Sequence, residues 1–149
     1  QPKVIEFNCR FGDPETQPIM LRLESDLVGF CLKACDGKLN EVKSQWNPKS
    51  SLGIVLAAEG YPGDYRKGDE ITGLPQSAVE NEKVFLAGVA EQEGKLVTNG
   101  GRVLCVTALG ESVFEAQQKA LKLAEQIQWS GHFYRRDIGY RAVEREQQK

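Results

Sequence analysis

The sequence has few of the residues that crosslink small secreted proteins or build zinc sites. It contains four cysteines and one histidine among 149 residues, and no two cysteines form a Cys-x-x-Cys pair. Cys31 and Cys35 would share a face of a helix, but two ligands do not make a zinc site, and His132 is distant in sequence. We therefore interpret the cysteines as small buried thiols in a reducing cytosol, and expect a cytoplasmic location.

The sequence also lacks a long hydrophobic run and a strong net charge. No window approaches the ~20 apolar residues that span a bilayer, and no signal peptide precedes the first apolar segment. The 19 basic and 21 acidic residues leave a net charge of -2, which gives no general footprint for nucleic acid. We expect neither a membrane nor a nucleic acid among the partners.

The residues that are present are typical of a soluble globular protein. Hydrophobic residues make up 40% of the chain and charged residues 27%, and a chain of this length can bury roughly two thirds of its unfolded surface. The sequence begins without methionine and enters an apolar segment at Val4 and Ile5. Because a strand so near the end needs neighbours, we interpret the start as a cut inside a larger protein.

The first third of the sequence predicts a strand, a loop and a helix. Residues 3–8 indicate a short strand, and residues 9–18 are a loop rich in Gly, Asp, Pro and Glu. Ser25 offers a capping oxygen, Asp26 suits the positive start of a helix, and Gly37 can adopt the left-handed conformation that ends one. We therefore expect a helix from Ser25 to Gly37.

The rest of the sequence predicts short strands after a polar linker at residues 38–51. Residues 51–58 are an apolar run, and residues 84–89 and 95–98 flank a Gly-containing turn, which indicates a hairpin. Residues 102–109 are apolar at successive positions, as in a central strand.

A helix should follow the central strand. Ser112 and Glu115 form a capping box, in which the Ser side chain accepts from the third helical amide and the Glu side chain reaches back to the first residue of the box. The helix is predicted to run to about Gln128. Apolar residues recur on one face at helical spacing: Val113, Ala116, Ala120, Leu123, Ala124 and Ile127. Strands covered by such a helix predict an α+β fold.

Polar side chains alternate along the first predicted strand. Glu6, Asn8 and, if the strand continues, Arg10 point to one side. A carboxylate and an amide carbonyl are hard oxygen ligands suited to Mg²⁺, and a guanidinium beside them can hold a phosphate or carboxylate. The same spacing also fits the solvated face of an edge strand, so both interpretations stay open.

The loop after this strand has the same two interpretations. Gly12 lets backbone approach a ligand, and Asp13 and Glu15 could hold a substrate ammonium. Alternatively the loop is a helix entry, with Asp13 as N-cap and Pro14 at the first helical position. One role does not exclude the other.

The segment Arg10-Phe11-Gly12-Asp13-Pro14-Glu15-Thr16-Gln17 resembles the signature of the phosphoribosylamine–glycine ligase (glycinamide ribonucleotide synthetase) family. Further stretches resemble that family in the same order: residues 25–28, 51–53, 57–65, 98–104 and 137–141. The resemblance covers nearly the whole chain, which makes it far more specific than a lone glycine pattern.

The resemblance implies a fold and a set of site residues. Residues 1–50 would be the C-terminal end of an ATP-grasp domain, and residues 51–149 a small C-terminal α+β domain of antiparallel sheet with helices. Glu6 and Asn8 would bind Mg²⁺, with Mn²⁺ as the other possible ion, and Arg10 would be catalytic. Substrate-binding roles would fall to Arg10, Gly12, Asp13, Glu15, Gly100, Gly101 and Arg102.

The implied reaction joins glycine to 5-phosphoribosylamine through glycyl phosphate, with ATP as co-substrate. In such chains the nucleotide pocket, the ATP lid, a second metal carboxylate and an N-terminal domain come earlier. We therefore expect the chain alone to be inactive, and the missing N-terminal part of the same enzyme to be its partner. The alternative is a non-catalytic module that packs against or complements a larger or multifunctional purine enzyme.

Residues outside the segment from Arg10 to Gln17 have weaker signals of their own. Gly100-Gly101-Arg102 precedes the central strand, either as a tight turn with a surface arginine or as backbone and guanidinium close to substrate. Residues 61–65 predict a structural turn. Structural roles are predicted for the remaining candidates: Asp137 paired with Arg141, His132 in local contacts, and Trp46 and Trp129 in packing.

Overall fold

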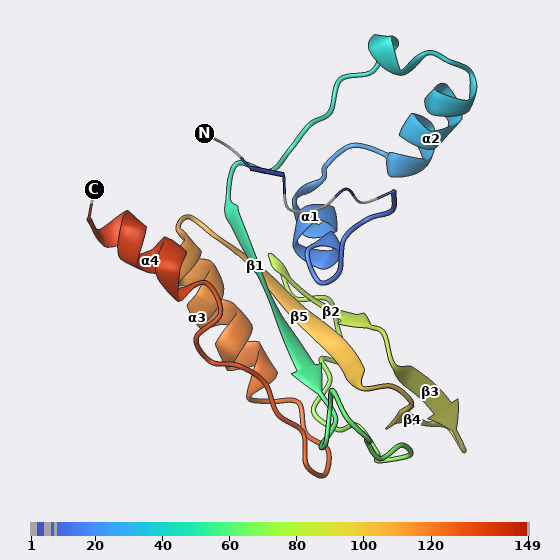
Figure 1. The fold of residues 1–149 in the computed structure, drawn as a ribbon, viewed down its shortest axis with the longest axis vertical. Helices are drawn as coiled ribbons and strands as arrows, with labels where there is room; N and C mark the ends of the chain where they lie inside the picture. The colour runs from blue at the N-terminus through green and yellow to red at the C-terminus, as the bar shows by residue number, and fades with distance from the viewer. Residues whose placement is uncertain (1–2, 5–6, 8, 149) are drawn as a thin grey trace.

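The computed structural model describes residues 3–4, 7 and 9–148. Its centre is a three-stranded antiparallel sheet (Figure 1) in the order β1 (Ser50–Ala57), β5 (Arg102–Gly110) and β2 (Glu82–Leu86). β5 is therefore the central strand, as its apolar sequence predicts.

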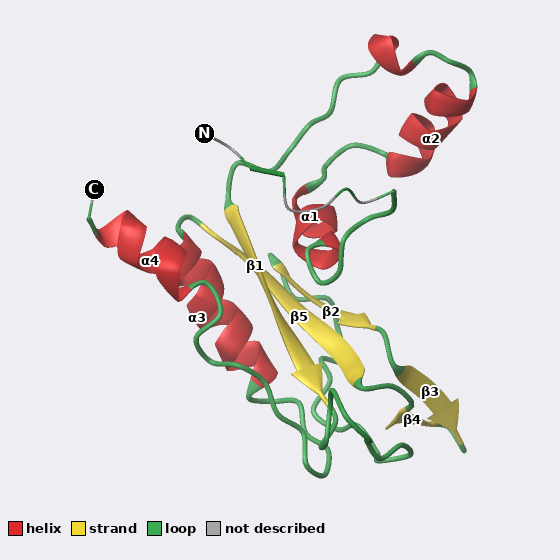
Figure 2. Ribbon diagram, in the orientation of Figure 1, coloured by secondary structure: helices red, strands yellow, loops and turns green. Residues whose placement is uncertain are grey.

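Helices cover both faces of this sheet (Figure 2). α3 (Val113–Ala124) packs on β1 and β5, and α4 (Tyr140–Gln147) lies beside α3. α1 (Thr16–Arg22) packs on the opposite face, whereas α2 (Leu27–Cys35) and the short 3₁₀ helix η1 (Leu39–Glu41) stand away from the sheet. This is the predicted α+β arrangement of antiparallel sheet and helices. No helix in the described part of the chain is long and apolar enough to cross a membrane.

The hydrophobic core lies between the sheet and α3. Alternate residues of β1 and β5 point toward this helix, and the most deeply buried are Ile54, Leu56, Leu104 and Val106. Burial of each such side chain contributes about 1.5–3 kcal/mol. The helix presents the predicted small apolar face, but it ends at Ala124 rather than near Gln128. Ile127 beyond its end is still fully buried.

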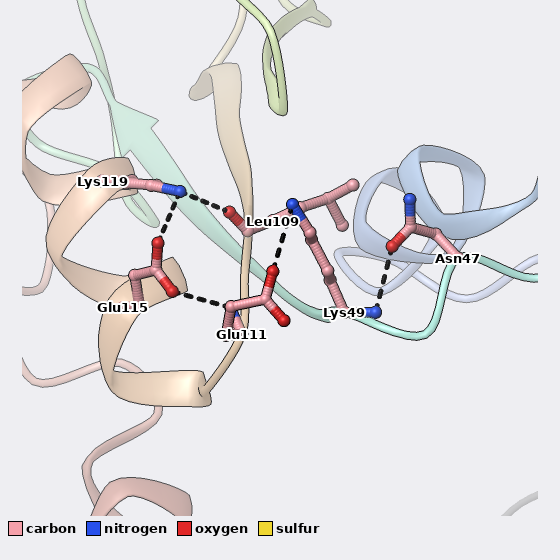
Figure 3. A network of polar contacts seen from close by, with 6 residues as sticks. All are labelled: Asn47, Lys49, Leu109, Glu111, Glu115 and Lys119. Carbon is pink, nitrogen blue, oxygen red and sulfur yellow. Dashed lines mark hydrogen bonds and ion pairs between the residues drawn. The ribbon is translucent and has the colours of Figure 1, made fainter.

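The start of α3 is fixed by the predicted cap and by a polar network (Figure 3). Ser112 Oγ accepts from Glu115 N at 3.1 Å, while the Glu115 carboxylate accepts from Glu111 N at 2.8 Å instead of from the capping residue. Lys119 Nζ lies 2.7 Å from Glu115 Oε1, and Lys49 Nζ lies 3.2 Å from Glu111 Oε1. The network joins α3 to the segment that precedes β1.

The hydrogen bond from Lys119 lowers the pKa of the Glu115 carboxyl, with help from the amide of Glu111. The same contact raises the pKa of the Lys119 ammonium. Since a lowered folded-state pKa means that the ionised carboxyl is favoured by folding, this contribution is present above the unfolded pKa. It is lost as the pH falls through the folded pKa.

The charged end of the chain is a helix with a structural role that its sequence does not indicate. The Glu146 carboxylate of α4 accepts from Val113 N at 2.9 and 3.0 Å and from Phe114 N at 3.3 Å. A carboxylate on the first amides of a helix is favourable for hydrogen bonding and for the helix dipole.

We expect Glu146→Ala to lower the free energy of unfolding by about 1 kcal/mol, because the first amides of α3 lose their acceptor. Urea unfolding followed by circular dichroism measures the change. Glu144→Ala, which removes an exposed carboxylate of the same helix, is the matched control. Equal effects of the two substitutions would contradict the capping role.

The N-terminal predictions need correction. Residues 3, 4 and 7 belong to no strand, and Phe7 is 90% exposed. The other three residues of the predicted strand 3–8 lie outside the described residues. The N-cap of α1 is Glu15 without a side-chain bond, so the helix entry predicted at Asp13 is wrong.

The second helix begins one residue later than predicted. Asp26, not Ser25, is the N-cap, and its carboxylate accepts from Val28 N and Gly29 N. The Ser25 hydroxyl instead accepts from Gln45 N at 2.7 Å, because the chain returns there after η1. The predicted left-handed stop is confirmed, since Gly37 has φ 69°.

The predicted hairpin is wrong in its first strand. Residues 84–89 contain the end of β2, which pairs with β5, and the start of β3 (Val89–Gln92), which pairs with β4 (Lys95–Thr98). The break falls at Gly88, where an added Cβ would lie 2.7 Å from Gly100 Cα. This close approach of two backbones, distant in sequence, divides one apolar run into two strands.

Two structural assignments outside the sheet were also wrong. Asp137 pairs with Arg135 at 2.7 Å rather than with Arg141, and Trp46 is 45% exposed rather than packed. His132 does make the predicted local contact, with Nδ1 2.9 Å from Trp129 O, and Trp129 is buried.

Candidate functional site

Two separate parts of the predicted substrate site meet in the structure. Arg102 Nη2 lies 2.6 Å from Asp13 Oδ2, although 89 positions separate the two residues. The side chains are 44% and 50% exposed. An exposed ion pair of this kind contributes at most about 1 kcal/mol to stability, so the fold does not depend on it. Both charges remain accessible to a ligand.

The fold brings these residues together through α1. Arg102 is the first residue of β5, and Asp13 lies in the loop that leads into α1 on the same face of the sheet. Thr16 N donates to Gly12 O at 3.3 Å, and the Thr16 hydroxyl donates to the same oxygen. Gly53 permits the packing, since an added Cβ would lie 2.9 Å from Pro18 Cγ.

Two tyrosines complete the surroundings of Arg102. Gly101 is buried, and a Cβ added there would lie 2.4 Å from Tyr61 Cδ2 and 2.9 Å from Tyr65 Cε1. The Arg102 Cζ atom lies 5.9 Å from the centre of the Tyr61 ring, within the range of a cation–π contact. Residues 61–65 form the predicted turn, but the turn also packs against the candidate site. Nothing in the sequence spacing links positions 61 and 101.

The other predicted site residues lie less close together. Arg10 is exposed and its Nη1 donates to Phe11 O at 2.8 Å. Glu15 is exposed, and Gly100 packs against Gly88. Within the described part of the chain, neither Arg10 nor Glu15 has a hydrogen bond or ion pair to Arg102.

The predicted metal ligands Glu6 and Asn8 lie outside the described residues. Among the residues that are described, no group of three or more His, Cys, Asp or Glu side chains could hold a metal ion. The chemistry of the two predicted ligands, a carboxylate and an amide carbonyl, fits Mg²⁺.

Cys105 lies under the site, and the prediction of buried thiols holds for this cysteine alone. Cys9, Cys31 and Cys35 are exposed, so their predicted burial is wrong. Burial, together with the smaller effect of the negative charge of Asp13, raises the pKa of the Cys105 thiol to about 12. Because only a thiolate reacts readily, the four thiols should differ sharply in reactivity.

We expect iodoacetamide at pH 8 to modify Cys9, Cys31 and Cys35 in the folded protein, and Cys105 at a rate roughly 1000-fold lower. Intact mass spectrometry over time would show three additions, with a fourth after addition of urea. A fourth addition at the same rate without urea would contradict the burial of Cys105.

An apolar cavity lies elsewhere in the molecule. It has a volume of about 540 Å³ and is lined mostly by apolar side chains of residues 74–79 and β2, with Leu96 and Leu123. None of the predicted site residues lines it, and it brings no convergent set of charges together. The Asp13–Arg102 region is therefore the candidate functional site.

Comparisons with known proteins agree with the resemblance in the sequence. A model of the "Phosphoribosylglycinamide synthetase, C domain" family matches residues 51–141. The phosphoribosylamine–glycine ligase of Haemophilus influenzae is 90% identical over 149 residues, which are all of this chain and 35% of that protein. The same ligase of Pasteurella multocida is 80% identical over 146 residues, covering 98% of this chain and 34% of that protein.

A solved structure is also similar. The crystal structure of phosphoribosylamine–glycine ligase from Thermotoga maritima matches with a TM-score of 0.78 and 44% identity, over 92% of this chain and 33% of that one. The chain thus spans about a third of the length of the relatives that it matches.

Proposed function

Because the chain belongs to the phosphoribosylglycinamide synthetase family, we propose that it is the C-terminal part of a phosphoribosylamine–glycine ligase. The whole enzyme would join glycine to 5-phosphoribosylamine and release ADP, phosphate and glycinamide ribonucleotide in purine biosynthesis. The observation that supports a role in this chemistry is the meeting of Asp13 and Arg102, which places opposite charges side by side at an accessible surface.

The proposed reaction needs activation of a carboxylate, which is a poor electrophile. Transfer of the γ-phosphate of ATP to a glycine carboxylate oxygen forms glycyl phosphate, and breaks the bond between the β,γ-bridging oxygen and the γ-phosphorus. The amine of phosphoribosylamine then attacks the carbonyl carbon, loses a proton and displaces phosphate. No covalent enzyme intermediate is required, so the protein acts by positioning and charge neutralisation.

The site residues divide between these tasks by their charge. In the proposal Arg102 holds an anionic group of a substrate, and Asp13 and Glu15 hold the glycine ammonium. Arg10 neutralises charge on the transferred phosphate, and Gly12, Gly100 and Gly101 let backbone approach the substrates. Glu6 and Asn8 would hold Mg²⁺ or Mn²⁺, which when bound neutralises phosphate charge.

The remainder of the enzyme is the proposed partner of this chain. Large apolar side chains are exposed throughout the first 46 residues: Val4, Phe7, Phe11, Val28, Leu32, Leu39 and Trp46. On α2, Val28 and Leu32 are 66% and 63% exposed and four residues apart on one face. An apolar face of this kind is typical of an interface.

We expect Leu32→Asp to change the free energy of unfolding of the 149-residue chain by less than about 0.5 kcal/mol, because the side chain is exposed. In a full-length ligase that contains this chain, the same substitution should lower the free energy of unfolding by about 2 kcal/mol or more, because the aspartate carboxylate would be buried in the interface. Urea unfolding of both proteins tests this, with Lys38→Asp as the exposed control. Equal small effects in both contexts would contradict the interface.

A cytoplasmic location is part of the proposal, supported by four free cysteines of which three are exposed. The alternative is a non-catalytic module of a larger or multifunctional purine enzyme. Such a module would need the apolar face but not the charged site.

The test is a chimera in which this chain replaces the matching third of the Haemophilus influenzae ligase. ADP release that depends on both glycine and phosphoribosylamine should occur in the chimera and not in the 149-residue chain. Absence of turnover from a folded chimera would refute the ligase function. Full turnover after replacement of both Asp13 and Arg102 would support the non-catalytic alternative instead.

A further inference from the structure

The Arg102 guanidinium is held in place from two sides. Asp13 binds it through a single atom, Nη2, at 2.6 Å, and the Tyr61 ring lies on another side with its centre 5.9 Å from Cζ. Among the described residues, the other nitrogens of this guanidinium have no hydrogen-bond acceptor. Since a guanidinium carries five N–H donors, most of its capacity to bind a planar or tetrahedral oxyanion is unused.

The Tyr61 ring is itself held in place by the backbone at Gly101, the residue that precedes Arg102. Ala58 N donates to Gly101 O at 2.8 Å, and Tyr61 N donates to Ala58 O at 3.2 Å, so the 58–61 segment is tied to residue 101. The ring occupies the space that a side chain at position 101 would fill. Tyr61 therefore has a defined position beside Arg102, and its ring restricts where the long arginine side chain can go.

A second arginine in the protein shows what distinguishes this arrangement. Arg136 also pairs with a carboxylate, of Glu125 at 2.7 Å, and lies over a tyrosine ring, of Tyr134 at 5.3 Å. Its Nη2, however, also donates to the Tyr134 hydroxyl at 3.2 Å. Arg136 thus uses one of its N–H donors in a hydrogen bond to its neighbouring tyrosine, whereas Arg102 contacts Tyr61 only through the ring.

We propose that Tyr61 is a positioning residue which holds the Arg102 guanidinium ready to bind a substrate oxyanion. The oxyanion is either the carboxylate of the amino acid or the phosphate of the sugar phosphate, which present the same chemistry to a guanidinium. The identity of these substrates rests on the proposed function, whereas the positioning of Arg102 by Tyr61 does not.

The first experiment measures kcat and both KM values in the chimeric ligase. Tyr61→Leu should raise the KM of one substrate about 10-fold and leave kcat within 2-fold, and Tyr61→Phe should keep the wild-type KM because the ring is retained. A raised KM for glycine identifies the carboxylate as the bound group, and a raised KM for phosphoribosylamine identifies the phosphate. Tyr134→Leu, at the Arg136–Tyr134 pair, should change neither value.

A double substitution separates positioning from a general loss of structure. If Tyr61 acts through Arg102, Tyr61→Leu should have no further effect on KM in an Arg102→Lys background. The proposal would be overturned if the KM increases of the two single substitutions multiplied in the double variant, or if KM were unchanged in Tyr61→Leu. Gly101→Ala is an independent variant, since its added methyl would displace the ring, and it should reproduce the KM effect of Tyr61→Leu.

A binding experiment on the 149-residue chain decides the matter if the chimera shows no turnover. Inorganic phosphate and acetate are titrated while the Arg102 Nε–Hε resonance is followed by NMR. The resonance should shift in the wild-type chain and in Tyr61→Phe, with at least 5-fold weaker binding in Tyr61→Leu. Equal affinity in wild type and Tyr61→Leu would overturn the positioning role, whatever reaction the parent enzyme catalyses.

Discussion

Arg102→Ala should lower kcat/KM of the chimeric ligase about 100-fold, which corresponds to ~2.7 kcal/mol of transition-state stabilisation. The expected size follows from loss of a charged hydrogen-bond donor at the site that we propose binds substrates carrying negative charge. Arg102→Lys should recover only part of the activity, because an ammonium keeps the charge but lacks the planar pair of donors. Initial rates of ADP release at varied glycine and phosphoribosylamine provide the measurement.

Arg136→Ala is the matched control for this prediction. Arg136 has the same type of exposed ion pair and the same type of tyrosine contact as Arg102, but its carboxylate partner is Glu125 at the C-terminal end of α3. Its removal should leave kcat/KM within 2-fold. If the two alanine variants are equally active, Arg102 has no role in the reaction and the charged site is structural.

Ile54→Ala should lower the free energy of unfolding by about 2–5 kcal/mol, with a fall in Tm of roughly 10 °C. Ile54 is fully buried at the centre of β1, opposite Val106 of β5 and under α3. Truncation removes buried methyl and methylene groups and leaves a cavity that the surrounding strands cannot fully close. Urea unfolding and a thermal melt of the 149-residue chain measure both quantities.

Val28→Ala serves as the control for the core substitution, because Val28 is 66% exposed on α2. It should change the free energy of unfolding of the 149-residue chain by less than about 0.5 kcal/mol. A similar loss in both variants would mean that the α2 region, rather than the sheet and α3, carries the stability of this chain.

Patterns that depend on neighbouring residues were readable from the sequence. The central strand at residues 102–110, the Ser112 cap and the apolar face of α3 follow from side chains within one element, so alternation and helical spacing specify them. The stop at Gly37 is equally local, since glycine tolerates a positive φ. The α+β class follows from these elements, while the domain boundary at residue 50 stays a prediction.

The failures occurred where a distant contact overrode a local preference. Asp13 has the sequence of a helix cap, yet its carboxylate lies against Arg102. The apolar run around residues 84–89 is divided because Gly88 meets Gly100. The C-terminal helix, for which the sequence analysis made no prediction, places Glu146 at the first amides of α3. Each partner lies at least 12 positions away, beyond any periodic pattern.

The sequence by itself therefore determined the candidates for substrate binding, because Asp13, Gly101 and Arg102 were identifiable from residue type and resemblance. Only the tertiary structure decided which of them meet. The packing of α1 on the sheet brings Asp13 to Arg102, the first residue of β5. The backbone hydrogen bond from Ala58 N to Gly101 O brings Tyr61 beside the same arginine. Such contacts depend on how elements pack, and packing is a property of the whole core rather than of a local pattern.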